Sequence, residues 1–176
     1  SDVDFVRVVH DGVTDAVLRR RADIGVAVFA EDAPIADPDR FLANDRLVGL
    51  VRDDHAAARR GALVPEDIRT SVYLTRGDRP QRGFEHHRFF EPAGVRPHAL
   101  RKVESVALIV RLMRRHGGVT VQPRLVLGDA DLTGLAVVPL ANTEIAVRWA
   151  FALRADPSDA HLEICQAIRS LVAAAT

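Results

Sequence analysis

Stretches of consecutive apolar residues alternate along the chain with segments in which apolar residues recur every three or four positions. The first pattern is typical of strands covered on both faces, and the second of helices with one buried side. The apolar stretches predict strands at residues 3–9, 24–29, 41–51 (one or two strands), 72–75, 98–104, 119–123, 135–140 and 144–153.

The helical spacings predict five helices or helical turns, and several of these have recognisable ends. The predicted helices lie at residues 13–21, 64–68, 82–94, 105–118 and 158–175. Pro65 suits the first position of a helix, and Ser105 suits an N-cap, since its hydroxyl can accept a hydrogen bond from a free backbone N–H. Pro92 and Gly94 are expected to end the helix at 82–94.

Strands that alternate with helices indicate an α/β fold with mainly parallel sheets. The middle of the chain, residues 50–143, contains a nearly complete series of strands and helices of its own. We therefore expect two lobes, one formed by residues 50–143 and the other by residues 1–49 and 144–176. The strands at 46–52 and 144–153 would be the only crossings between them, as in a hinged, clamshell-type ligand binder.

The composition excludes several classes of function. The 176 residues carry 24 acidic and 24 basic side chains, so the formal charge is zero, which argues against a phosphate-binding surface for nucleic acid. We find no run of about 20 apolar residues that could span a membrane and no secretory signal. The expected location is the cytoplasm, without contact to a membrane.

Cys165 is the only cysteine, so the chain has neither a disulfide framework nor a thiolate metal cluster. It recurs with Leu162, Ile168 and Val172 at helical spacing, which predicts one core-facing stripe on the last helix. We interpret Cys165 as a buried thiol and not as a nucleophile.

A cluster of polar residues, Asp53, Asp54 and His55, lies where the apolar run DRLVGLV ends. Such a cluster is compatible with a metal site, a general acid–base site or a polar loop that closes a strand. No further metal-ligand spacing, nucleophile–base pair or phosphate-binding glycine loop accompanies it. We therefore expect neither a metal, a cofactor nor catalysis.

Candidate ligand-binding residues follow the carboxyl ends of the predicted strands, where ligands of open α/β sheets bind. Thr14 and Ser105 lie at predicted helix starts, and TRGDRPQR after the strand at 72–75 begins with Thr75 and Arg76. Arginines 76, 79 and 82 are suited to bind a carboxylate, because a guanidinium can hold a carboxylate through two hydrogen bonds. They therefore predict a small organic acid as the ligand. The alternatives are plain helix caps for the hydroxyls and solvated loop charges for the arginines.

Four segments resemble, in order and spacing, the effector-binding domain of LysR-type transcriptional regulators. They are RRRADIGVAV, DRLVGLVRDDHAAARRGALVPEDI, EPAGVRPHALRKVESVALIVRLMRRHGGVTVQP and LTGLAVVPL. The family's Pro-Leu after the Asp-His pair is replaced by Ala56-Ala57. The resemblance covers residues 3–175 and implies a two-lobed periplasmic-binding-protein-like fold (type II).

The resemblance also implies roles for individual residues. It places a small-molecule effector in the crevice between the lobes, with Thr14, Ser105, Gln122, Pro123 and Arg124 as contacts. Asp54 and His55 would form a turn away from that crevice. Gly49, at a crossing strand, becomes a candidate hinge residue, or else a glycine that packs against a large neighbour.

Regulators of this family begin with a winged helix-turn-helix, a linker helix and a first strand–helix unit, none of which is found in these residues. DNA binding is therefore expected only through that absent N-terminal part. The resemblance implies homodimers or homotetramers, with Phe5 and Val6 as candidate interface residues. A transporter's solute-binding protein of the same architecture is the alternative function, and an enzyme on this scaffold is a third.

Overall fold

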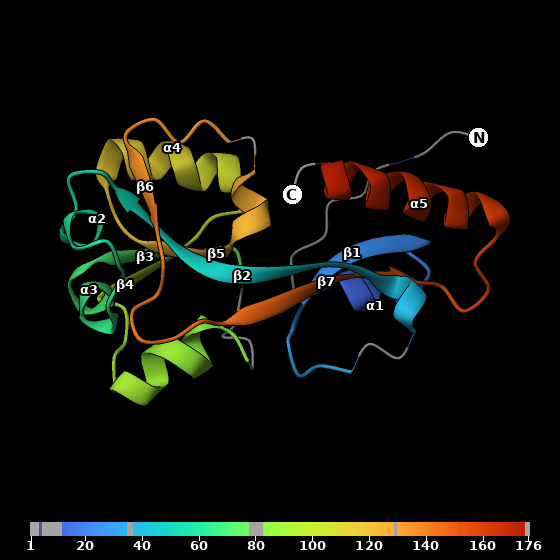
Figure 1. Ribbon diagram of the computed structural model, residues 1–176, viewed down its shortest axis with the longest axis horizontal. Helices are drawn as coiled ribbons and strands as arrows, with labels where there is room; N and C mark the ends of the chain where they lie inside the picture. Colours follow the sequence, from blue (N-terminus) through green and yellow to red (C-terminus); the bar gives the residue numbers. More distant parts are fainter. Residues whose placement is uncertain (1–3, 5–11, 35–36, 78–82, 129, 175–176) are drawn as a thin grey trace. The chain divides into compact units, whose positions relative to one another are not determined.

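The computed structural model describes residues 4, 12–34, 37–77, 83–128 and 130–174, and the chain divides into two compact units (Figure 1). Unit 1 consists of Ser1–Phe29, Ala33–Asn44 and Arg148–Thr176, and unit 2 of Ala30–Asp32 and Asp45–Val147. The boundary falls inside two long strands, β2 (Phe41–Arg52) and β7 (Ala146–Leu153). The lobe limits expected from the sequence stay a prediction.

In unit 1, helices lie on both sides of the strands (Figure 1). Its elements are α1 (Val13–Leu18), β1 (Ile24–Ala30), η2 (Pro38–Arg40), parts of β2 and β7, and α5 (Asp159–Ala174). In the sheet, β7 lies between β1 and β2. A Cβ added at Gly25 would lie 2.5 Å from Val13 Cγ1, so this glycine allows α1 to approach β1 closely. On the other side, Arg169 of α5 donates to the carbonyl of Asp39 (2.6 Å).

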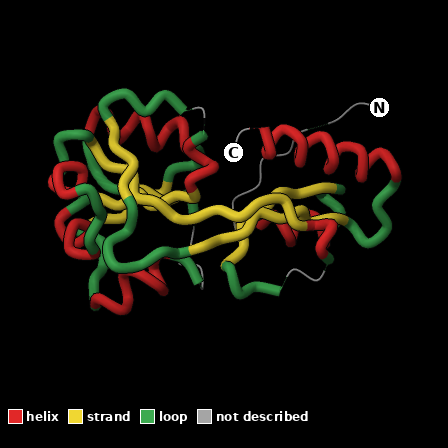
Figure 2. Tube along the Cα trace, viewed as in Figure 1, coloured by secondary structure: helices red, strands yellow, loops and turns green. Residues whose placement is uncertain are grey.

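Unit 2 contains the remaining elements, in which helices and strands alternate (Figure 2). They are α2 (Ala56–Arg60), α3 (Pro65–Thr70), β3 (Val72–Thr75), the π-helical turn η3 (His86–Phe90), η4 (Glu91–Ala93), β4 (Ala99–Lys102), α4 (Val106–His116), β5 (Thr120–Pro123), η5 (Arg124–Leu127) and β6 (Leu135–Val138). Strands β3 and β4 pair in parallel, and Tyr73 forms a parallel bridge with Val119, just before β5.

Strand β2 runs antiparallel to both β5 and β6, so the expectation of mainly parallel pairing is wrong for this strand. Leu50 is aligned with Thr120 on one side and with Val137 on the other. The period of apolar residues reports whether a strand is covered, but it carries no information about the direction of its neighbours.

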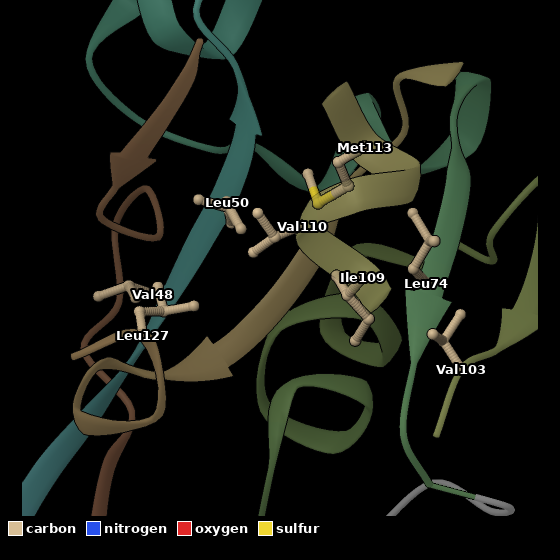
Figure 3. Close-up of a cluster of buried hydrophobic side chains, with 8 residues drawn as sticks. All are labelled: Val48, Leu50, Leu74, Val103, Ile109, Val110, Met113 and Leu127. Carbon is tan, nitrogen blue, oxygen red and sulfur yellow. The ribbon is translucent and has the colours of Figure 1, made fainter. Parts of the chain in front are cut away.

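The core of unit 2 fills the space between β2, β3, α4 and η5 (Figure 3). Its members are Val48, Leu50, Leu74, Val103, Ile109, Val110, Met113 and Leu127. Ile109, Val110 and Met113 point from one face of α4, as the spacing i, i+1, i+4 requires. Leu50, Ile109, Met113 and Leu127 have no exposed surface, so this cluster anchors the strands that carry the site described below.

Most predicted elements are confirmed within one or two residues, including Pro65 as the first residue of α3 and Ser105 as the N-cap of α4. The predicted helix at 82–94 is instead a π-helical turn followed by a 3₁₀ turn, which ends at Gly94 with a φ of 62°. The predicted strand at 3–9, with Phe5 and Val6, lies outside the described residues, apart from residue 4. None of the helices in the described ranges is long and apolar enough to cross a membrane.

The predicted buried stripe of α5 is wrong at its first position. Leu162 is 48% exposed, whereas Cys165 is buried and Ile168 and Val172 are half-buried. In the first turn of the helix, His161 Nδ1 accepts from the backbone N–H of Ser158 (2.9 Å). Periodicity predicts which residues share one side of a helix, but it does not predict how far along the helix that side is covered.

Candidate functional site

Arg76 follows β3 directly and is the centre of the candidate site. The strand ends there because the hydroxyl of Thr75 accepts from the backbone N–H of Gly77 (3.2 Å), which closes a turn. The half-buried Arg76 donates from Nε to Oε1 of Gln122 (3.2 Å). Burial lowers the pKa of Arg76 from its usual value, but a guanidinium keeps its proton in proteins.

Gln122 belongs to a buried chain of hydrogen bonds within unit 2. Its Nε2 donates to Oγ1 of Thr120 (2.8 Å), and that hydroxyl donates to the carbonyl of Leu74 (2.7 Å). Thr120 and Gln122 are 0% and 3% exposed. Residues i and i+2 of a strand point to the same side, so β5 presents both polar groups toward the end of β3.

Within the described ranges, no carboxylate forms an ion pair with Arg76, and burial is the only cause of its lowered pKa. A partly desolvated guanidinium is costly unless an anion compensates it. Its planar set of donors matches a carboxylate with two parallel hydrogen bonds. The arrangement is therefore suited to bind a small anion next to Gln122.

Two other predicted site residues follow Gln122 along the chain. Pro123 is buried at the end of β5 and is aligned with Leu47 of β2. Arg124 opens η5 and is exposed. Asp45 Oδ2 accepts from the backbone N–H of Leu125 (3.0 Å), which ties this segment to β2.

Within unit 2, the predicted site residue Ser105 is not a hydrogen-bond partner of Arg76. Ser105 caps α4 in unit 2, and Thr14 is exposed in the first turn of α1 in unit 1. Arginines 79 and 82 lie outside the described residues. The structure thus brings together Arg76 and Gln122, with Thr75, Pro123 and Arg124 as their chain neighbours, and the ligand roles of all these residues stay predictions.

Tyr73 of β3 and Glu85 form a buried polar pair that was not predicted from the sequence. Tyr73 donates its hydroxyl proton to Oε1 of Glu85 (2.9 Å), and the ring packs edge-on against His86 and Phe90. Burial raises the pKa of Glu85, while the hydrogen bond from Tyr73 partly opposes this shift. Burial also raises the pKa of Tyr73 well above its usual value. No periodicity marks Glu85, because it precedes an irregular helical turn.

The family model described as LysR substrate binding domain matches residues 2–172. The chain belongs to this family. The LysR substrate binding domain has a two-lobed periplasmic-binding-protein-like fold, and the fold and family expected from the sequence are confirmed.

Solved structures of LysR-family regulators resemble this LysR domain at low sequence identity. The regulatory domain of MetR from N. meningitidis matches with a TM-score of 0.67 and 21% identity, over 92% of this chain and 75% of that one. The BenM effector binding domain with its effector benzoate matches with a TM-score of 0.59 and 21% identity, over 93% and 75%. The effector binding domain of QuiR in complex with shikimate matches with a TM-score of 0.62 and 14% identity, over 90% and 75%. The comparison with curated proteins gives no match.

In this LysR domain the Asp54-His55 pair forms a turn, as expected. His55 is the N-cap of α2, where its Nδ1 accepts from the backbone N–H of Ala57 (3.1 Å). Asp54 accepts two hydrogen bonds from Arg52, and these bonds lower the pKa of the Asp54 carboxyl. Both side chains are therefore occupied in closing β2 and starting α2.

Gly49 lies in β2 between Val121 of β5 and Val138 of β6. A Cβ at this position would lie 3.0 Å from Leu63 Cδ2 and 3.2 Å from Val138 Cγ2. Close packing against large neighbours, the alternative considered from the sequence, therefore accounts for this glycine. Its role as a hinge stays a prediction.

Replacing Ser105 by Ala is expected to lower the free energy of unfolding by about 1 kcal/mol, because Ser105 Oγ accepts from the backbone N–H of Leu108 (3.3 Å) at the start of α4. Urea denaturation followed by circular dichroism measures the effect. Ser105→Asn is the matched control and should keep most of the stability, since Asn caps helices equally well. Equal losses in both variants would contradict the capping role.

Replacing Glu85 by Gln is expected to change how stability depends on pH. Because burial raises the pKa of Glu85 in the folded state, the folded chain binds this proton more tightly than the unfolded chain. The stability of the wild type relative to Glu85→Gln should therefore be greatest below the ordinary carboxyl value of 4.5 and fall as pH rises through the raised pKa. Thermal denaturation at several pH values measures this, with the exposed Glu163→Gln as control. If the difference in stability between the wild type and Glu85→Gln does not change with pH over this range, Glu85 is not buried as described.

Proposed function

We propose that the chain is the effector-sensing domain of a LysR-type transcriptional regulator and that Arg76 binds the carboxylate of a small organic acid. One observation carries the ligand class. The Arg76 guanidinium is half-buried and oriented by Gln122, and within the described residues no carboxylate neutralises it. An anionic ligand would supply the missing partner.

The ligands of two structural neighbours support this ligand class. The BenM domain is described with benzoate and the QuiR domain with shikimate, and both ligands are carboxylates at neutral pH. At 21% and 14% identity these neighbours share the fold with this chain, so they support the chemistry of the ligand and do not identify it.

The proposed role is recognition and not catalysis. The Thr120 hydroxyl is engaged by the Leu74 carbonyl and by Gln122, so it offers no free nucleophile, and an arginine does not act as a general base at neutral pH. Binding selects one conformation of the domain, because a ligand shifts an equilibrium toward the state that it binds better. In the regulator this change would reach DNA through an N-terminal domain and a homodimeric or homotetrameric assembly in the cytoplasm.

Isothermal titration with benzoate and shikimate, followed by a wider panel of small carboxylates, tests the proposal. Benzamide and methyl shikimate are the matched neutral controls, because each keeps the ring and lacks the charge. We expect saturable binding of at least one carboxylate and a much weaker response to its neutral analogue. Folded, intact protein that binds none of the carboxylates, or binds the neutral analogue as tightly, contradicts the proposal.

A further inference from the structure

The hydrogen bonds that link Leu74, Thr120, Gln122 and Arg76 can run in one direction only. At one end the carbonyl of Leu74 can only accept, so the Thr120 hydroxyl must donate to it. The same oxygen must then accept from Gln122, which turns the amide nitrogen of Gln122 toward Thr120. The amide oxygen consequently faces Nε of Arg76, which can only donate.

We propose that Thr120 is a positioning residue that orients the Arg76 guanidinium for carboxylate binding through Gln122. This inference rests on the proposed function for its ligand. Thr120 does not itself contact the anion, since it is buried with no exposed surface. The Thr120 hydroxyl sets which end of the Gln122 amide faces Arg76. The amide oxygen of Gln122 then holds Nε of Arg76, and this bond orients the two terminal nitrogens of the guanidinium.

Thr120→Val keeps the shape of the side chain and removes the hydroxyl. The Nε2 group of Gln122 then loses its acceptor, so the side chain is no longer fixed on β5 and can move to find another partner. When Gln122 moves, Arg76 Nε loses the fixed oxygen to which it donates, and the guanidinium is no longer held in place. Thr120→Ser restores the hydroxyl with a smaller side chain and should restore the orientation.

The first measurement needs no ligand. In NMR spectra of the wild type, the Nε–H proton of Arg76 should exchange with water at least about tenfold more slowly than that of the exposed Arg96. The reason is that Arg76 Nε is held in a partly buried hydrogen bond to Gln122. In Thr120→Val this protection should be lost, and in Thr120→Ser it should persist. Equal exchange of Arg76 and Arg96 in the wild type overturns the inference even if no variant folds.

The second measurement is isothermal titration of the same proteins with benzoate and shikimate, or with the acid of the panel that binds. Thr120→Val should bind about tenfold more weakly than the wild type, and Thr120→Ser should bind like the wild type. His55→Ala is the stability control, because it removes a helix cap in unit 2 and should leave the affinity unchanged.

The two measurements separate failure of the inference from failure of the proposed function. If Thr120→Val speeds the exchange of Arg76 but binds the acid as tightly as the wild type, Thr120 does not position Arg76 for binding. If the wild type binds no carboxylate while the exchange responds as expected, the positioning role stands and the proposed function fails. If His55→Ala weakens binding as much as Thr120→Val, the effect is one of stability and the inference is wrong.

Discussion

Arg76→Met is expected to weaken binding of the carboxylate effector by about thirtyfold or more. Removing one partner of a partly buried, hydrogen-bonded charge pair costs about 2–5 kcal/mol, and each 1.4 kcal/mol is about tenfold in affinity. Met keeps most of the apolar volume of the arginine stem, so the loss reports on the guanidinium. Isothermal titration with the acid of the panel that binds measures the change.

Two further variants make this result specific. Arg76→Lys keeps the charge but not the planar pair of donors, so it should fall between the wild type and Arg76→Met. Arg96→Met removes an exposed charge of unit 2 and should leave the affinity within about twofold, as expected for a solvent-screened charge. Equal losses in Arg76→Met and Arg96→Met would show that only the overall charge matters, and an unchanged affinity in Arg76→Met would remove this residue from the site.

Leu50→Ala is expected to produce the largest loss of stability, about 2–5 kcal/mol in the free energy of unfolding. Leu50 has no exposed surface and lies on β2 where this strand pairs with β5 on one side and β6 on the other (Figure 3). The Leu50 side chain projects from the sheet into the core cluster, so truncation leaves a cavity among the packed side chains of α4 and η5 (Figure 3). Urea denaturation followed by circular dichroism measures the effect.

Leu100→Ala is the matched control for this truncation. Leu100 is 50% exposed on β4, so its loss removes little buried apolar surface and should cost less than about 1 kcal/mol. A similar cost in both variants would contradict the assignment of Leu50 to the core of unit 2.

Local signals explain why most helices and strands were predictable. Pro65 and Ser105 act within one turn of their own position, and the apolar stretches of β1, β3 and β5 report burial directly. The failures are of another kind. The direction of β2 relative to β5 depends on residues far along the chain, and the exposure of Leu162 depends on how much of α5 the rest of the fold covers.

The candidate site was predictable in its parts but not in its assembly. Arg76 was predicted from its place after a strand, and Gln122 from the resemblance to the LysR family. Their contact joins residues 46 positions apart, and no periodicity predicts such a pair. The place of Thr120 in the candidate site was not predicted. The alternation in TVQP does indicate that Thr120 and Gln122 point to the same side of β5. Glu85 was missed because only the folded chain shows that Tyr73 meets it.

The most direct test of the central claim is an NMR titration of ¹⁵N-labelled protein with the carboxylate panel, observed at the Nε–H of Arg76 and the side-chain amide of Gln122. The Arg76 signal is assigned by its loss in Arg76→Met. We expect at least one carboxylate to shift both signals to saturation, while its neutral analogue leaves them unchanged. If a carboxylate binds the folded protein without moving either signal, or if no carboxylate moves them, Arg76 does not hold the effector and the account is wrong.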